Sequence, residues 1–220
     1  MDQSMVFLFF GGVSQDGISW AVDYDKVLYE LARWLLPVGI CLLAEGVRLE
    51  KWRKIEQLSC YRYETIKMWW RQKFFGGLVY GILAAAILFI IAMAADLVNA
   101  GGIPDEGWKV FVLWIAHMAT ILSFLLVLDL SGLGKPAPAV LLLLEGLTFL
   151  AGFAYMGAAR FMFGMWGMYF QSRWYRGDRG VSVLPSLISE GILIMLGYLT
   201  GEIIVKEGAY VWQRLLKSRI

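Results

Sequence analysis

Three ionisable residues within apolar stretches are the positions where this chain could do chemistry: Glu145, Arg160 and Glu190. Inside a membrane such residues are expensive, and they usually mark a substrate path or pair with another helix. Glu145, which follows Leu141–Leu144, has two interpretations. It is either a polar point on a substrate path or at a contact with a second subunit, or a protonated or hydrogen-bonded residue that packs helices. Glu190 and Arg160 are predicted to pair with each other.

The remaining ionisable residues of the apolar stretches are expected to have structural roles. His117 is the single histidine of the chain. A lone histidine in a membrane helix more often hydrogen-bonds to a neighbouring helix than binds a metal, so His117 is assigned to no site. Asp96, Asp129 and Glu202 lie near the ends of apolar runs, where side chains reach water at little cost. These three are expected to be solvated.

No motif in the sequence indicates catalysis. The segment Gly132–Pro136 resembles a phosphate loop only superficially, because the spacing would require Gly in place of Asp129 and a hydroxyl residue in place of Pro136. Zinc-protease, nucleophile-elbow and Cys-His patterns are missing as well. Cys41 and Cys60 are expected at different depths and show no metal-ligand spacing. We therefore expect neither an enzyme nor a metal or cofactor site in this chain.

The composition indicates a membrane protein. Hydrophobic residues make up 59% of the 220 residues, whereas a soluble domain has about 45–50%. The mean hydropathy is +0.62. The net charge of +2 is too small to indicate a nucleic-acid partner.

Long apolar runs predict an all-α polytopic membrane bundle that forms a single domain over residues 1–220. A helix needs about 20 apolar residues to cross the hydrocarbon core, and no alternating barrel pattern is present. The runs therefore predict five spans, at residues 28–46, 76–97, 108–130, 137–157 and 184–205.

The distribution of Lys and Arg predicts the orientation. Residues 47–74, between the first two spans, form the densest basic stretch of the chain, and such loops face the cytoplasm. The amino terminus is then outside, and the basic tail at residues 206–220 is inside the cell.

The stretch after the fourth span is apolar for longer than one crossing requires. Residues 158–183 could continue the helix, form an outer re-entrant piece or loop, or cross the membrane once more. An extra crossing would send the basic tail outside, so the re-entrant piece is favoured.

The connection between the first two spans is predicted to be an amphipathic elbow. In Val47–Lys73 the apolar residues recur at helical spacing, and Ser59 and Cys60 interrupt them, which predicts two short helices with a bend. The elbow either lies on anionic lipid, with Trp69 and Trp70 as anchors, or docks a cytosolic partner.

The pattern of Leu35–Pro37 followed by Tyr61–Trp70 resembles permease subunits of type-two ABC exporters, especially bacterial bacteriocin and lantibiotic transport systems. Many of these carry an Arg-Tyr-Gly-Ser-like element followed by basic and Trp residues. In this sequence, the positions that match or surround the element are Arg62, Tyr63, Glu64, Lys67, Trp69 and Trp70, although Glu64 and Thr65 replace the usual Gly and Ser.

The resemblance implies a permease subunit in the bacterial cell membrane whose elbow contains the coupling helix. Its partners would be a separate ATPase subunit, which binds ATP and Mg²⁺, a second permease of the same or a different kind, and membrane lipid. The cargo would be a peptide or an amphipathic compound.

Two alternatives stay open at this point. One is a non-transporting sensor, immunity or assembly factor whose basic elbow binds lipid or a regulator. The other is a membrane enzyme that acts on lipid, with Glu145, Glu190 and Arg160 as its polar centre.

Overall fold

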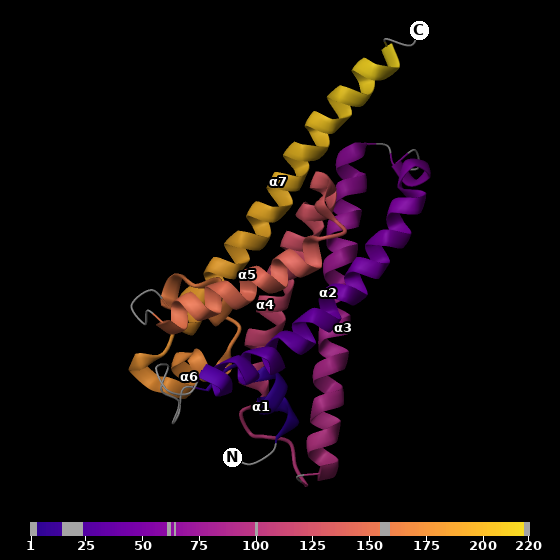
Figure 1. The fold of residues 1–220 in the computed structure, drawn as a ribbon. Coiled ribbons are helices and arrows are strands. Elements are labelled where there is room, and N and C mark those ends of the chain that lie inside the picture. The colour runs from indigo at the N-terminus through magenta and orange to yellow at the C-terminus, as the bar shows by residue number, and fades with distance from the viewer. Residues whose placement is uncertain are drawn as a thin grey trace.

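The computed structural model describes residues 4–14, 24–60, 63, 65–99, 101–154 and 159–217, without the side chains of residues 55–60 and 208–217. Within these residues the chain is helical, and its only β-type pairing is an isolated bridge between Ser172 and Val181. The α-helices are α1 (Met5–Phe10), α2 (Tyr24–Cys60), α3 (Ile66–Asn99), α4 (Gly107–Leu128), α5 (Ala137–Ala154), α6 (Arg173–Arg176) and α7 (Val183–Lys217), as Figure 1 shows.

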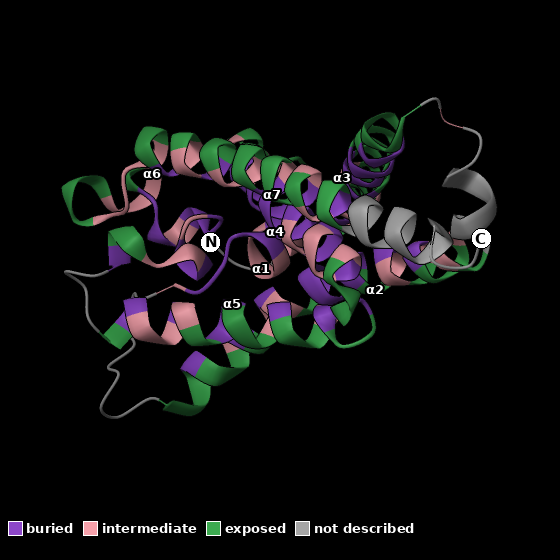
Figure 2. Cartoon of the chain, turned by 90° about the horizontal axis from the view of Figure 1, so that it is seen from above, coloured by how far each residue is buried: buried purple, intermediate pink, exposed green. Residues whose placement is uncertain are grey.

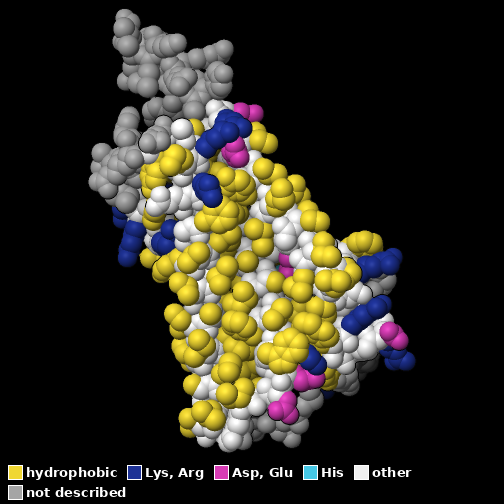
Figure 3. Space-filling model, turned by 180° about the vertical axis from the view of Figure 1, so that it is seen from behind, with side chains coloured by type: hydrophobic (Ala, Val, Ile, Leu, Met, Phe, Trp, Pro, Cys, Tyr) yellow, Lys and Arg dark blue, Asp and Glu magenta, His cyan; other side chains and the backbone are white. Residues whose placement is uncertain are grey.

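Five of the described helices are long and apolar enough to cross a membrane. The predicted all-α polytopic bundle is thereby confirmed. One face of the molecule shows hydrophobic side chains over the middle of the helices, while Lys, Arg, Asp and Glu side chains gather toward the two ends (Figure 3). The spanning stretches lie at Tyr24–Lys54, Ile66–Asn99, Gly107–Leu133, Ala137–Ala154 and Val183–Glu207.

Helix α4 forms the centre of the bundle. In the most apolar 18-residue stretch of α4, 67% of the residues are buried, whereas the corresponding stretches of α3 and α7 are 28% and 17% buried. Helices α3 and α7 pack against α4 (Figure 2). Because α3 and α7 expose most of their apolar surface, they form much of the face that lipid or another membrane subunit can cover.

Helix α1 is a short helix packed into one end of the bundle, against α2, α3 and α4. Its first backbone N–H groups have no partner within the helix. The carboxylate of Asp96 accepts from the Ser4 hydroxyl at 2.7 Å and from the Val6 N–H at 3.1 Å. The prediction that Asp96 is solvated is therefore wrong, since the residue is 1% exposed and satisfies the start of another helix.

The predicted elbow is built from the ends of two long helices. Helix α2 continues to Cys60 and α3 begins at Ile66. Ser59 and Cys60, where the interruption was predicted, therefore lie within α2, and separate short helices do not form. Only residues 61–65 connect the two. The α2–α3 connection and the end of α7 lie at the same end of the molecule (Figure 1).

The segment at residues 159–182 consists of short helical turns, of which α6, with four residues, is the longest. None of these described turns can cross a membrane. The segment is fastened to the amino-terminal part of the chain by a hydrogen bond from the Phe170 N–H to the Gly11 carbonyl, at 2.9 Å, and by one from Gln171 Nε2 to the Val13 carbonyl, at 2.6 Å. Its re-entrant character stays a prediction.

Candidate functional site

The first group of candidate residues lies where the α2–α3 hairpin enters the bundle. Asp129 begins the π-helical turn η1 (Asp129–Leu133) after α4. Its Oδ2 lies 3.0 Å from Lys73 Nζ of α3, and its Oδ1 lies 2.9 Å from Arg53 Nε of α2. The side chains of both Lys73 and Asp129 are 1% exposed. The prediction that Asp129 is solvated is wrong, because this carboxylate joins both arms of the hairpin to the end of α4.

The indole of Trp70 joins the same part of α3 to α7. Trp70 is fully buried, and its Nε1 donates to the Tyr198 carbonyl at 3.0 Å. Gly201 makes room for the ring, since a Cβ at this position would overlap the indole. At the surface nearby, Lys67 Nζ lies 2.9 Å from Glu202 Oε1. Glu202, expected to be solvated, is thus half-buried and paired with Lys67.

The structure places the predicted coupling residues in two kinds of environment. Lys67 is exposed and Tyr63 is half-buried, whereas Trp69 and Trp70 are buried and cannot serve as anchors at the membrane surface. Lys73 Nζ lies 5.0 Å from the centre of the Trp69 ring, which stabilises the ammonium within the bundle. Arg62 and Glu64 lie outside the described residues.

The second group is a buried polar cluster at the centre of the bundle. His117 Nε2 lies 2.9 Å from Glu145 Oε1 of α5, and His117 Nδ1 lies 3.0 Å from Glu190 Oε1 of α7. Trp34 of α2 donates its indole N–H to Glu145 Oε1 at 3.0 Å. We call these four residues the His117 cluster. At a rise of about 1.5 Å per residue, His117 lies roughly 15 Å from either end of α4.

The segment at residues 159–182 packs directly on the His117 cluster. A Cβ on Gly167 would meet the imidazole at 2.5 Å, so glycine lets the backbone pack directly on His117. The Phe163 ring covers the imidazole at a centroid distance of 4.6 Å. His117, Glu145 and Glu190 are each at most 1% exposed.

The predicted pair of Arg160 and Glu190 is wrong. Glu190 faces His117 inside the bundle, while Arg160 is exposed and its guanidinium lies 4.9 Å from the centre of the Phe161 ring. Helix α7 turns the face that carries Glu190 toward His117 of α4. For Glu145, the interpretation as a hydrogen-bonded residue between helices agrees with these contacts.

The expectation that His117 hydrogen-bonds to a neighbouring helix agrees with its contacts to Glu145 and Glu190, but sequence reasoning missed that these two carboxyl groups are its partners. The available signal was that an imidazole and two carboxyl groups each lie inside a predicted span, where every ionisable group needs a partner. Which partner each takes depends on the rotation of the helices, and apolar run length does not determine it.

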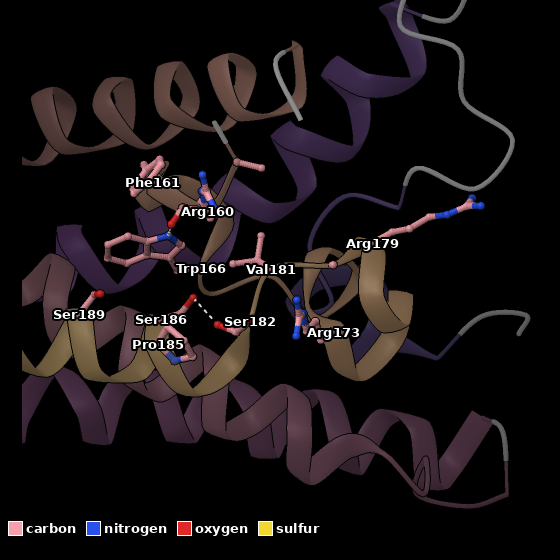
Figure 4. Close-up of a pocket in the computed structure, with 12 residues that line it drawn as sticks. Arg160, Phe161, Trp166, Arg173, Arg179, Val181, Ser182, Pro185, Ser186 and Ser189 are labelled. Carbon is pink, nitrogen blue, oxygen red and sulfur yellow. Dashed lines mark hydrogen bonds between the residues drawn. The ribbon is translucent and has the colours of Figure 1, made fainter. Parts of the chain in front are cut away.

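A pocket of about 770 Å³ lies beside the first turns of α7 (Figure 4). This start of α7 lies away from the end of the molecule that holds the α2–α3 connection (Figure 1). Arg160, Phe161 and Trp166 line one side and the serines of α7 line another, whereas the Arg179 side chain extends away from the centre (Figure 4). The serines of α7 are Ser186 and Ser189, and the further polar lining residues are Ser182, Arg173 and Arg179.

The described part of the chain contains no group of three or more His, Cys, Asp or Glu side chains arranged to hold a metal ion. Comparisons with protein-family models, with curated proteins and with solved structures find no match.

Proposed function

We propose that this chain is the membrane-spanning permease subunit of an ATP-driven transporter, in which a separate ATPase subunit acts on the α2–α3 connection. The observation that carries the proposal is the junction at the base of the hairpin. There Asp129 holds Lys73 of α3 and Arg53 of α2 at 3.0 and 2.9 Å, which ties both arms to the central helix.

This junction supports the transmission of force from the connection into the bundle. Helix α3 is continuous over 34 residues, and α2 covers 37 residues with Pro37 inside it. Because an interior proline kinks a helix, a displacement of the joined ends moves α3 and the part of α2 between Pro37 and Cys60. Trp70 carries the same displacement to α7 through its hydrogen bond to the Tyr198 carbonyl. Packed helices of this kind have few intermediate arrangements, and they shift as rigid bodies.

The proposed orientation follows the distribution of basic residues. The α2–α3 connection and the carboxyl terminus face the cytoplasm, and the amino terminus faces outside. ATP and Mg²⁺ bind to the ATPase subunit, which contacts the residues around 61–67. A second permease, the same or different, covers part of the exposed apolar surface, and the cargo is a peptide or an amphipathic compound.

Affinity purification of the tagged chain from its own cells tests the proposal. We expect a nucleotide-binding subunit to co-purify with the wild-type chain and with Asp129→Asn, because residue 129 is at the base of the hairpin and not at its tip. Transport by the Asp129→Asn complex should fall at least tenfold while its ATPase subunit stays bound. Asp105→Asn, an exposed carboxylate in the loop before α4, is the matched control.

Two outcomes would contradict the proposal. If no nucleotide-binding subunit accompanies the wild-type chain, the sensor, immunity or assembly role becomes the better explanation. If an impermeant thiol reagent labels Cys60 in intact cells, the connection faces outside and no cytosolic ATPase can reach it. Cys41 is fully buried and should not contribute to that signal.

The polar centre expected for a lipid-acting enzyme does not assemble. Arg160 is exposed on the surface, while Glu145 and Glu190 both face His117. Activity of the isolated chain on lipid without ATP is the measurement that would favour that function.

A further inference from the structure

The His117 cluster contains three ionisable groups whose charges must balance inside the membrane. An imidazole can carry one proton more than its neutral form, and each carboxylate can take up one. With an imidazolium and two carboxylates the cluster has a net charge of −1. Among the described residues, neither Glu145 nor Glu190 has a Lys or Arg within ion-pair distance. Because an unbalanced charge at membrane depth is expensive, one further proton is needed for neutrality.

The hydrogen-bond donors around the cluster indicate where this proton lies. Glu145 Oε1 faces two donors, the Trp34 indole N–H and His117 Nε2. Glu190 Oε1 faces only His117 Nδ1. Two donors stabilise the anionic form of a carboxyl group more than one donor does. Glu145 is therefore the carboxylate that balances the imidazolium, and Glu190 is the carboxylic acid.

We propose that the His117 cluster is a proton-binding site inside the membrane, in which Glu190 takes up and releases one proton. The Oε2 atoms of Glu190 and Glu145 are both buried without a hydrogen-bond partner among the described residues, so the donors at the two Oε1 atoms decide which carboxyl group holds the proton. Uptake transfers a proton from a hydronium ion to the carboxylate and leaves a water molecule, so the step needs no other reactant.

The described contacts of the cluster come from α2, α5, α7 and the segment at residues 159–182. Helix α2 presents Trp34, α5 presents Glu145 and α7 presents Glu190. The segment at 159–182 presents the Phe163 ring and the backbone of Gly167, which do not titrate. The titratable groups of the site are therefore His117 and its two carboxyl partners.

The pocket beside α7 provides a route for the proton. Ser186 and Ser189 line it, and Ser186 precedes Glu190 by four residues, which places both on one face of the helix. Ser186 and Glu190 are also both buried, so this face passes from the pocket to the cluster. We infer that the proton exchanges with water on the pocket side, away from the α2–α3 connection.

Proton release would weaken the hold of α7 on the bundle. The Glu190–His117 contact joins α7 to α4, and α7 has the least buried window of the spanning helices. Without the proton the cluster keeps its net negative charge, which hydration would relieve if the two helices separated. The proton thus favours the arrangement of the structure, in which Glu190 of α7 contacts His117 of α4.

Nitrogen-15 NMR of the wild-type chain tests the assignment of the imidazolium, because His117 is the single histidine. The chain is labelled with ¹⁵N-histidine, purified with an affinity tag that contains no histidine and reconstituted in lipid without an ATPase subunit. We expect both ring nitrogens to be protonated at neutral pH. A neutral tautomer, with one protonated and one bare nitrogen, would overturn the assignment without any substitution.

Infrared spectroscopy of the same preparation tests the proton on Glu190. The carbonyl stretch of a buried carboxylic acid should be present at neutral pH, disappear reversibly at alkaline pH and be missing from Glu190→Gln. The control Glu207→Gln, an exposed carboxylate on the same helix, should keep the band. A band that Glu190→Gln leaves unchanged, or the lack of any such band in wild type, would overturn the proposal.

His117→Gln provides a second variant in case Glu190→Gln fails to fold. Without the imidazole, neutrality requires a proton on each carboxyl group, so the band should roughly double. A band no larger than in wild type would count against the charge argument. All these measurements use the isolated chain, so their outcome is independent of whether an ATPase subunit binds.

Discussion

Removal of the carboxylate at position 129 is the most direct test of the junction at the base of the hairpin. Asp129→Asn removes the carboxylate that lies 3.0 Å from Lys73 Nζ, and the Lys73 side chain is 1% exposed. Arg53 also loses a partner, but its side chain is 29% exposed and can be solvated. Loss of one member of a buried ion pair costs about 3–5 kcal/mol. We expect the free energy of unfolding in detergent to fall by that amount, mostly through Lys73.

A double variant separates the loss of one member of the buried ion pair from a general loss of packing. Lys73→Met combined with Asp129→Leu replaces both charges by apolar groups, and such replacements are often neutral or stabilising. The double variant should therefore recover most of the stability that Asp129→Asn loses. If Asp129→Asn lies within about 1 kcal/mol of wild type, or if the double variant is as unstable as the single ones, the buried-pair argument fails.

Three further predictions concern contacts elsewhere in the bundle. Gly201→Val should lower the stability by about 1–3 kcal/mol because its side chain would overlap the Trp70 indole. Thermal unfolding measures this loss, and Gly76→Val, at a position with open space, is the control. Asp96→Ala should cost about 0.5–2 kcal/mol by removing the acceptor at the start of α1, and equal stability of variant and wild type would refute this role. Reversal of both charges, at Arg160 and Glu190, should not restore the stability that Glu190→Arg alone loses, and the coupling energy between the two positions should be below about 0.5 kcal/mol. If the unfolding measurement shows that stability is restored, Arg160 and Glu190 form the pair that the structure contradicts.

The ends of the helices could be predicted only in part. The apolar runs predicted five spanning helices, and five of the described helices are long and apolar enough to cross a membrane, because burial in lipid requires an uninterrupted stretch of the right length. The basic elbow was expected to form two short helices, but it consists of the end of the long helix α2 and the start of the long helix α3. Packing supplies the reason: Lys73, Trp69 and Trp70 are buried against neighbouring helices, which keeps this polar stretch helical.

The environments of the ionisable residues could also be predicted only in part. Asp96 and Asp129 were expected to reach water because each lies near the end of an apolar run. Each instead meets a specific demand of a distant segment, the free N–H groups of α1 for Asp96 and the buried Lys73 for Asp129. Sequence separations of about ninety residues, as between Val6 and Asp96, leave no local pattern from which such a partner can be inferred.

The amino-acid sequence alone determined that this chain is a helical membrane protein, and it identified Glu145 and Glu190 as groups that need partners. Hydrophobicity and helical length are properties of contiguous residues, so the sequence contains them directly. Only the tertiary structure decided that both carboxyl groups meet on His117 and that Arg160 does not take part. That outcome depends on how α4, α5 and α7 are rotated about their axes, which the packing of all the helices sets together.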